Sequence, residues 1–182
     1  MQFVVPFEAR SSQEHPRQSS SVRGLVVGRF QPLHKGHVAL IKQAQEQCVE
    51  LAIVIGSTQA KVTARNPFTA AERRQMLQAL FPAVPVFEVP DLNDPPHWAA
   101  HCIATTGPVD RVYGNDDATL DLFEIDGVAV VRPGLVQRED YEASHIRALM
   151  AEDDPAWRKL VPPPIADLLV SWNAPRRLRE LL

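Results

Sequence analysis

The stretch from Gly24 to His37 constrains the fold more than any other part of the chain. It begins as a short apolar run ending at Gly28, breaks at Pro32, and resumes with a helical pattern from His37. This order predicts a strand, a tight turn and the start of a helix. A helix start presents unpaired backbone N–H groups and the positive end of the helix dipole, so it is a natural site for phosphate.

Two histidines, His34 and His37, stand three residues apart in this turn, with Gly36 between them. At the start of a helix that spacing lets both imidazoles face one oxyanion, and glycine allows a close backbone approach. Two other interpretations stay open from the pair alone. His34 could be a turn residue and His37 a helix cap. A zinc pair is also conceivable, although no Cys, Asp or Glu lies nearby at ligand spacing.

Length and composition limit the classes of protein that remain. The chain has 182 residues and 45% apolar content, enough for one hydrophobic core and too little for a second domain of normal size. The formal charge of −3 argues against a general nucleic-acid or membrane-surface binder. Cys48 and Cys102 are too few for a disulfide scaffold, which fits a reducing cytoplasm.

Residues 1–21 differ in composition from everything after them. The apolar segment Met1 to Phe7 lacks a basic flank and a long hydrophobic region, so neither a signal peptide nor a membrane anchor is predicted. Residues 8–21 are rich in Ser, Gln, Arg and Glu and cannot bury enough apolar surface to order themselves. We therefore expect a disordered N-terminal tail at 1–21 and one folded domain at 22–182.

The rest of the chain alternates short apolar runs with helical patterns, which is typical of α/β proteins. One helix runs from about His37 to Cys48, and another begins at a capping box formed by Thr69 and Glu72. Because strands joined by helical crossovers pair in parallel, the sheet is predicted to be parallel. The expected strands are residues 22–28, 51–55, 84–89, 111–113 and 128–131.

Polar segments follow three of these strands at their carboxyl ends: Gly56–Gln59, Asp91–Pro96 and Gly114–Asp117. Ligands of open parallel sheets bind at this edge. Trp98 follows the second segment, so we expect its indole beside a ligand. A core tryptophan is the alternative at that position.

A second candidate phosphate site lies at Tyr141 to Met150. Ser144 is a suitable N-cap for a helix there, which would place Arg147 in the first turn beside the unpaired amides. Arginine at that end of a helix is repelled by the helix dipole, and a phosphate held between the two would reverse this cost. An ordinary surface arginine on a capped helix is the alternative.

Several segments together resemble one known family. The residues around the histidine pair are similar to the His-x-Gly-His signature of the nucleotidyltransferase superfamily, and within it to the archaeal-type nicotinamide-mononucleotide adenylyltransferases. Ser144–Arg147 resembles the motif whose arginine binds the ATP polyphosphate. Arg65–Arg73 is similar to a loop whose arginine contacts phosphate, and Trp98 matches a tryptophan that stacks on nicotinamide. The resemblance covers Gly24 to about Ile165.

This resemblance implies a single Rossmann-like α/β domain, with a five-stranded parallel sheet of order 3-2-1-4-5 flanked by helices and a small C-terminal helical part. It also implies the site residues. The catalytic residues would be His34, His37 and Arg147. The ATP and phosphate ligands would be Gly28, Arg29, Phe30, Gln31, Arg65, Ser144 and Ile146. The nicotinamide side would consist of Asp91, Asn93 and Trp98.

Four positions depart from the family pattern. Ala143 and Ser144 stand where related enzymes usually have Gly-Thr, His145 stands where they usually have a residue other than histidine, and Pro95 stands where an asparagine is expected. Serine can cap a helix as threonine does, so phosphate binding is expected to survive. Asn93 and Asp94 are the candidate substitutes for the missing asparagine.

The implied reaction transfers the adenylyl group of ATP to nicotinamide mononucleotide, giving NAD and pyrophosphate. Mg²⁺ would arrive with ATP, without a metal site built by the protein. We expect a cytoplasmic homo-oligomer that binds neither nucleic acid nor membrane. Another adenylyl- or cytidylyltransferase, such as a phosphopantetheine-type enzyme, should lack the Trp98 platform and the Arg65 segment. A non-catalytic nucleotide sensor should lose one histidine of the pair.

Overall fold

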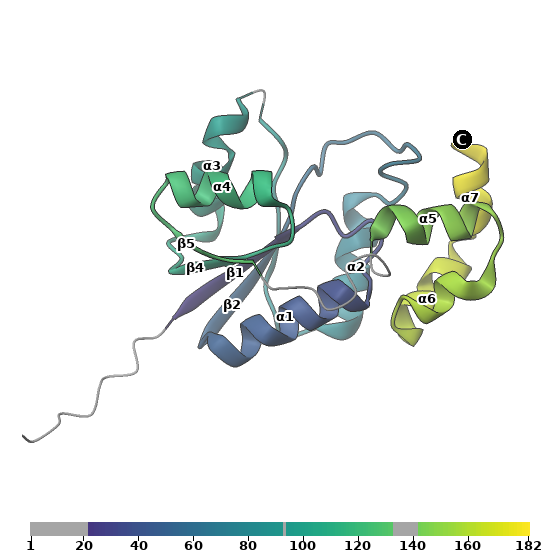
Figure 1. Ribbon diagram of the computed structural model, residues 1–182, viewed down its shortest axis with the longest axis horizontal. Helices are drawn as coiled ribbons and strands as arrows, with labels where there is room; N and C mark the ends of the chain where they lie inside the picture. Colours follow the sequence, from purple (N-terminus) through teal and green to yellow (C-terminus); the bar gives the residue numbers. More distant parts are fainter. Residues whose placement is uncertain (1–21, 93, 133–141) are drawn as a thin grey trace, which may run out of the picture.

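The computed structural model describes residues 22–92, 94–132 and 142–182 (Figure 1). The tail expected at 1–21 lies outside the described residues, and so does Asn93. In the part of the chain that is described, no helix combines the length and apolar character needed to cross a membrane.

Five parallel strands form one sheet in the order β3-β2-β1-β4-β5, which confirms the order implied by the resemblance. Strand β1 lies at the centre, where Val26 pairs with Ile53 on one side and Tyr113 on the other. A central parallel strand is buried on both faces, and β1 is accordingly a run of apolar residues. The strands are β1 (Arg23–Gly28), β2 (Glu50–Ile55), β3 (Val86–Glu88), β4 (Arg111–Tyr113) and β5 (Ala129–Val131).

Helices cover both faces of this sheet (Figure 1). Helices α1 and α2 pack on one face with Val26, and α3 and α4 pack on the other with Leu25 and Val27. The alternation along β1 thus divides the core into two clusters. The helices of these two layers are α1 (Lys35–Gln47), α2 (Ala70–Leu80), α3 (Trp98–Thr106) and α4 (Asp117–Ile125).

Three further helices form the small C-terminal part that was expected: α5 (Ala143–Ala151), α6 (Pro163–Ser171) and α7 (Ala174–Glu180). They lie beside α2, and their apolar residues join the core cluster of α1 and α2. Two short 3₁₀ helices, η1 (Pro95–His97) and η2 (Pro155–Lys159), complete the described elements.

Arg177 of α7 ties this C-terminal part to the loop before α2. Its guanidinium pairs with Glu72 at 2.8 Å and donates to the Pro67 carbonyl at 3.1 Å. The loop that carries Arg65 is therefore held by a helix more than one hundred residues further along the chain.

The two predicted helix caps had different outcomes. Thr69 caps α2 in the expected capping box, accepting from the Glu72 N–H while the Glu72 carboxylate accepts from the Thr69 N–H. The prediction of Ser144 as N-cap of α5 is wrong, because the helix begins at Ala143 and Glu142 occupies the cap position. The Ser144 hydroxyl instead donates to the Glu142 carboxylate at 3.2 Å.

Candidate active site

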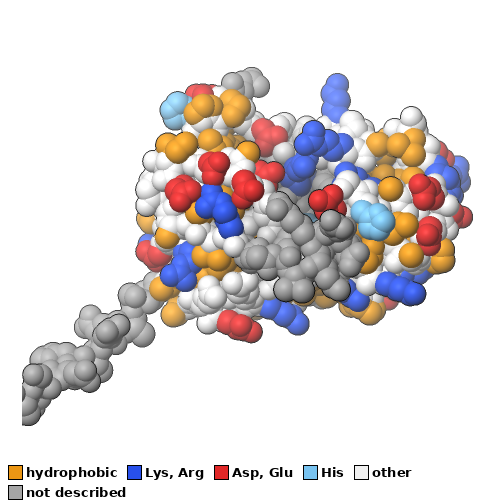
Figure 2. Space-filling view, in the orientation of Figure 1, with side chains coloured by type: hydrophobic (Ala, Val, Ile, Leu, Met, Phe, Trp, Pro, Cys, Tyr) orange, Lys and Arg blue, Asp and Glu red, His pale blue; other side chains and the backbone are white. Residues whose placement is uncertain are grey.

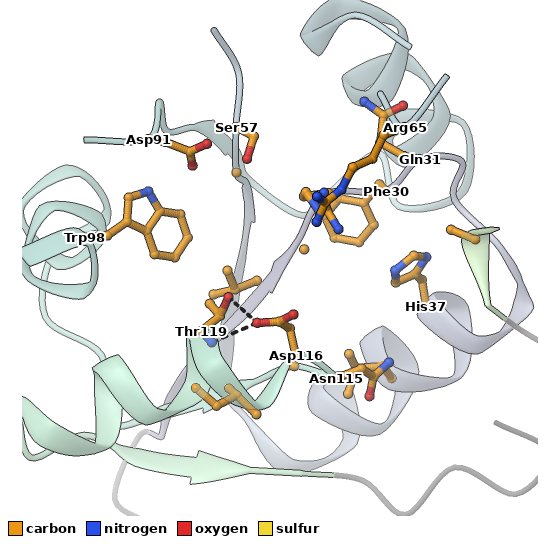
Figure 3. A pocket seen from close by; sticks show the side chains of 18 of the residues that line it. Phe30, Gln31, His37, Ser57, Arg65, Asp91, Trp98, Asn115, Asp116 and Thr119 are labelled. Atoms are coloured by element: carbon orange, nitrogen blue, oxygen red, sulfur yellow. Dashed lines mark hydrogen bonds between the residues drawn. The ribbon is translucent and has the colours of Figure 1, made fainter. Parts of the chain in front are cut away.

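A cleft of about 720 Å³ opens at the carboxyl ends of β1, β2 and β4 (Figure 3). The chain builds the sheet outward from β1 in one direction and then returns to add β4 on its other side. Binding sites of open α/β sheets lie at this kind of reversal in strand order. Residues from both phosphate candidates and from the nicotinamide-side segment line the same cleft.

His34, and not His37, is the N-cap of α1, so the alternative that assigned the cap to His37 is wrong. The Nδ1 atom of His34 accepts from the His37 N–H at 3.3 Å. In a neutral imidazole one nitrogen accepts and the other donates, so this contact assigns the proton to Nε2. The cap therefore leaves His34 with one N–H donor available for a ligand.

Both imidazoles of the motif are held neutral. Burial lowers the pKa of His34 to about 4. Burial and the neighbouring His34 lower the pKa of His37 well below its ordinary value. The two rings stack with their centroids 3.7 Å apart, and the His37 Nδ1 atom is buried without a hydrogen-bond partner among the described residues. An oxyanion in the cleft would accept a hydrogen bond from the Nε2–H of His34.

The turn between β1 and α1 is strained and closely packed. Phe30 adopts a left-handed conformation with φ of 52°, which costs on the order of 1–3 kcal/mol for a residue other than glycine. Its buried ring lies against Gly28, where an added Cβ would approach the ring to 2.9 Å. Gly28 is therefore required for packing, and its backbone borders the cleft.

Gln31 lines the cleft, but its side chain is committed to the protein itself. Its amide donates to the Phe68 carbonyl at 2.8 Å and accepts from the Phe68 N–H at 2.9 Å. This pair fastens the loop carrying Arg65 to the turn after β1. The structure therefore gives the Gln31 side chain a positioning role, which the assignment as a phosphate ligand did not anticipate.

Three arginines converge on the cleft from different elements: Arg29 after β1, Arg65 in the loop before α2, and Arg147 on α5. Arg147 donates to the Gln31 carbonyl at 2.8 Å. Burial, and then the positive charges of Arg29 and Arg65, lower the pKa of Arg147. Within residues 22–92, 94–132 and 142–182, none of the three forms a salt bridge.

We call Arg29, Arg65 and Arg147 the arginine cluster; Lys and Arg side chains also gather on the surface. In Figure 2, Lys and Arg side chains gather in the upper middle of the face, between the α3–α4 part and the C-terminal helices. Mutually repelling guanidinium groups without a salt bridge to a carboxylate of the described residues favour a polyanion between them. The cluster lies beside the two histidines, as a nucleotide triphosphate site requires.

Asp91 and Trp98 form the opposite end of the cleft, across from Arg65 and His37 (Figure 3). Trp98 is only 8% exposed, packs edge-on against Phe123, and donates from Nε1 to the Pro90 carbonyl at 3.2 Å. Its indole is thus a core side chain that also borders the cleft. The two interpretations of Trp98 do not exclude each other.

Most of the residues expected at the site line this one cleft, with clear exceptions. The side chain of Ile146 is fully buried in the core, and its N–H donates to the Glu142 carbonyl within the helix. Asn93 lies outside the described residues. The expected site residues did not include the third wall, where Asn115, Asp116 and Thr119 follow β4, although the segment Gly114–Asp117 was expected at this edge of the sheet. The polar run after that strand was the available signal.

One carboxylate oxygen of Asp116, in this third wall, already accepts hydrogen bonds from the protein. This oxygen caps α4, accepting from the N–H and the hydroxyl of Thr119 at 2.8 Å each (Figure 3). Ser57, which follows β2, also lines the cleft and has a left-handed φ of 53°.

A parallel sheet with a cleft at its strand reversal, a histidine pair at a helix start and an arginine cluster define a nucleotide-binding protein of the Rossmann-like class. Residues 25–148 match the model of the cytidylyltransferase-like family. A nicotinamide-nucleotide adenylyltransferase of Ignicoccus hospitalis is 38% identical over 88% of this chain and 98% of its own length. One of Methanolobus tindarius is 37% identical over 87% of this chain and 94% of its own.

The fold has a solved counterpart. A bifunctional NMN adenylyltransferase/ADP-ribose pyrophosphatase of Francisella tularensis, crystallised with AMP and a manganese ion, superposes with a TM-score of 0.67 at 18% identity. The similarity covers 88% of this chain and 52% of that one, so this chain spans about half of that larger protein. On these matches the chain belongs to the cytidylyltransferase-like family and, within it, to the nicotinamide-nucleotide adenylyltransferases.

Proposed function

We propose that this protein transfers the adenylyl group of ATP to nicotinamide mononucleotide, producing NAD and pyrophosphate. The observation that carries the proposal is the convergence in one cleft of His34, His37 and the arginine cluster with Asp91 and Trp98. The sequence similarity to nicotinamide-nucleotide adenylyltransferases along almost their whole length supports the same reaction.

The chemistry needs placement and charge neutralisation more than a protein nucleophile. A 5′-phosphate oxygen of nicotinamide mononucleotide attacks the α-phosphorus of ATP and forms a new P–O bond. The bond between that phosphorus and the bridging oxygen breaks, and its electron pair leaves with pyrophosphate. No covalent intermediate with the protein is required.

We assign the motif residues to these steps by their positions in the cleft. The Nε2–H of His34 and the imidazole of His37 donate to phosphate oxygens of ATP as negative charge grows on them. Arg29, Arg65 and Arg147 hold the remaining phosphates and stabilise the leaving pyrophosphate. Ser144 borders the same region and is available to the polyphosphate.

Mg²⁺ fits the site as a companion of ATP. The carboxylates that line the cleft are Asp91, Asp116 and Glu142, and one of them is engaged in capping a helix. Among the described residues, no three metal-binding side chains of the His, Cys, Asp or Glu type cluster together. Phosphate oxygens and water would therefore provide most ligands of the ion, as Mg²⁺ commonly prefers.

The nicotinamide ring is assigned to the Trp98 end of the cleft. An aromatic face attracts a cationic pyridinium ring by about 0.5–2 kcal/mol, depending on burial. Asp91 adds a negative charge beside that face, which favours a neutral carboxamide over a carboxylate on the ring.

The deciding experiment incubates the protein with ATP and Mg²⁺ and offers acceptors in parallel. The acceptors are nicotinamide mononucleotide, nicotinic acid mononucleotide and 4′-phosphopantetheine. NAD formation, followed by its enzymatic reduction to NADH, together with equimolar pyrophosphate is the expected result. Pyrophosphate release with phosphopantetheine alone, or with no acceptor, would contradict the proposal.

A further inference from the structure

Arg73 is the largest fully buried side chain of the described residues, although arginine is rarely buried without a charged partner. It lies in the first turns of α2 and is 2% exposed. No carboxylate of the described residues forms a salt bridge with it. The buried guanidinium must therefore be stabilised by interactions other than an ion pair.

The guanidinium is satisfied by backbone carbonyls. Nη1 donates to the carbonyls of Arg29 at 3.0 Å and Gly56 at 2.8 Å, and Nη2 donates to Ser57 at 3.1 Å. Nε donates to the Thr69 carbonyl at 3.3 Å, which fixes the guanidinium to its own helix. One side chain therefore joins the segments that follow β1 and β2.

These segments need such a partner because the sheet ladder stops beside them. The N–H of Gly56 donates to the Gly28 carbonyl at 3.0 Å, at the last paired position of β1 and β2. Phe30 and Ser57 then turn into left-handed conformations. The carbonyls to which Arg73 donates belong to these turns, and buried carbonyls without a donor are costly.

We propose that Arg73 is a positioning residue for adenylyl transfer. Its guanidinium sets the spacing of the two turns and thereby places Arg29, the backbone of Gly28 and Ser57 around the nucleotide. This inference rests on the proposed function. Arg73 itself is buried and is not among the residues that line the cleft.

The planar fork of arginine is what the geometry requires. Three N–H groups reach carbonyls on two separate segments, whereas a lysine ammonium on a flexible stem cannot span them in one plane. Lysine would keep the positive charge at this position. It would not hold the two turns at the same spacing. Arg74 provides a matched control because it follows on the same helix, is partly exposed, and pairs with Glu88.

The test compares Arg73→Lys with Arg74→Lys in the full chain. Each variant is assayed for kcat and for KM of both substrates, about 20 °C below its own melting temperature. Misplacement of catalytic groups should lower kcat of Arg73→Lys by about tenfold or more, because small displacements can cost up to about 100-fold. Arg74→Lys should keep parental kcat.

A second measurement uses Arg73→Ala with and without millimolar guanidinium chloride. Partial recovery of kcat with guanidinium, and none with ammonium chloride, supports positioning by the fork. The proposal is overturned if Arg73→Lys melts at a lower temperature but keeps parental kcat and KM, since Arg73 would then only stabilise the fold.

The two proposals fail in different ways. If the parent protein makes no NAD, the proposed reaction is wrong, and calorimetric titration with Mg²⁺ and ATP then tests Arg73 alone. Under the positioning role, Arg73→Lys should weaken ATP binding at least several-fold while Arg74→Lys does not. Equal ATP affinity in parent and both variants would overturn the role of Arg73.

Discussion

The two ends of the cleft are built differently. At the phosphate end, side chains are fixed by hydrogen bonds to the backbone around the β1 turn, as for His34 and Arg147. At the nicotinamide end, the loop after β3 is held by a bond from the Asp91 N–H to Gln59 and by the bond from Trp98 to Pro90. The two ends therefore differ in what is held: at the proposed phosphate end the His34 and Arg147 side chains bond to the backbone near the β1 turn, whereas at the proposed nicotinamide end the bonds hold the loop after β3 and the indole of Trp98.

Substitution of His37 by alanine is expected to have the largest effect on turnover. The change removes a donor to phosphate oxygens in the transition state, which typically lowers kcat by about 100-fold or more. Initial rates of pyrophosphate release measure the loss. Lys35→Ala, an exposed position in the same turn, is the control and should keep most activity. Parental turnover in His37→Ala would remove the histidine pair from the mechanism.

The neutral state of His34 predicts a pH dependence of stability. The pKa is about 4 in the folded protein and near 6.5 when unfolded, so below pH 6.5 the unfolded chain binds a proton that the folded imidazole does not. The contribution of neutral His34 to the free energy of unfolding should be fully present above pH 6.5. It should be lost progressively towards pH 4, by up to roughly 3 kcal/mol.

Denaturant titrations of parent and His34→Asn at several pH values measure this contribution. Asparagine can cap α1 but does not titrate, so its stability should fall less than that of the parent across the same range. Parallel curves for the two proteins would show that His34 is not held neutral. Saturating ATP should reduce the pH effect, because phosphate favours the protonated imidazole.

Removal of Arg147 should weaken ATP use more than acceptor use. A charge-assisted contact contributes about 1.5–3 kcal/mol, so Arg147→Ala should raise the apparent ATP constant about tenfold. Arg176→Ala removes an exposed arginine that pairs with Glu180 outside the cleft and serves as the control. Equal ATP affinity in Arg147→Ala and parent, measured by calorimetry, would place Arg147 outside the site.

The smallest substitution effect is expected at the nicotinamide end, from Asp91→Asn. Exposed charge pairs contribute about 0.2–1 kcal/mol, so use of nicotinic acid mononucleotide relative to nicotinamide mononucleotide should rise about fivefold at most. Asp94, a candidate substitute for the missing asparagine, instead pairs with His97 and is not among the residues that line the cleft, so Asp94→Asn serves as the control. An unchanged preference between the two mononucleotides in Asp91→Asn would show that this charge does not discriminate between a carboxamide and a carboxylate on the ring.

Sequence reasoning succeeded where the signal is local. The capping box at Thr69 and the strand and turn before His34 each follow from residues within a few positions of one another, whereas the parallel sheet follows from the alternation of strands and helices along the chain and its strand order from the family resemblance. Even so, the cap of α5 was misplaced by two residues to Ser144, because the helix begins at Ala143 and the Ser144 hydroxyl donates to Glu142.

The roles that were missed depend on distant partners. The Gln31 amide is used by Phe68, 37 residues away, and Arg73 bonds to carbonyls 16, 17 and 44 residues away. No period or motif in the sequence reveals such a pairing. The family resemblance supplied the arginine cluster, but it could not state which polar side chains the protein uses on its own backbone.

The pair between Arg177 and Glu72 has a consequence for folding kinetics. It joins residues 105 positions apart, and the contact of Arg147 with Gln31 joins residues 116 apart. Contacts at such separations form only after long loops have closed, which slows their appearance. We expect a refolding chain to regain far-ultraviolet circular dichroism, which reports local helix formation, before it regains affinity for a fluorescent ATP analogue in stopped-flow experiments. Simultaneous recovery of both signals would show that the nucleotide site forms together with the helices.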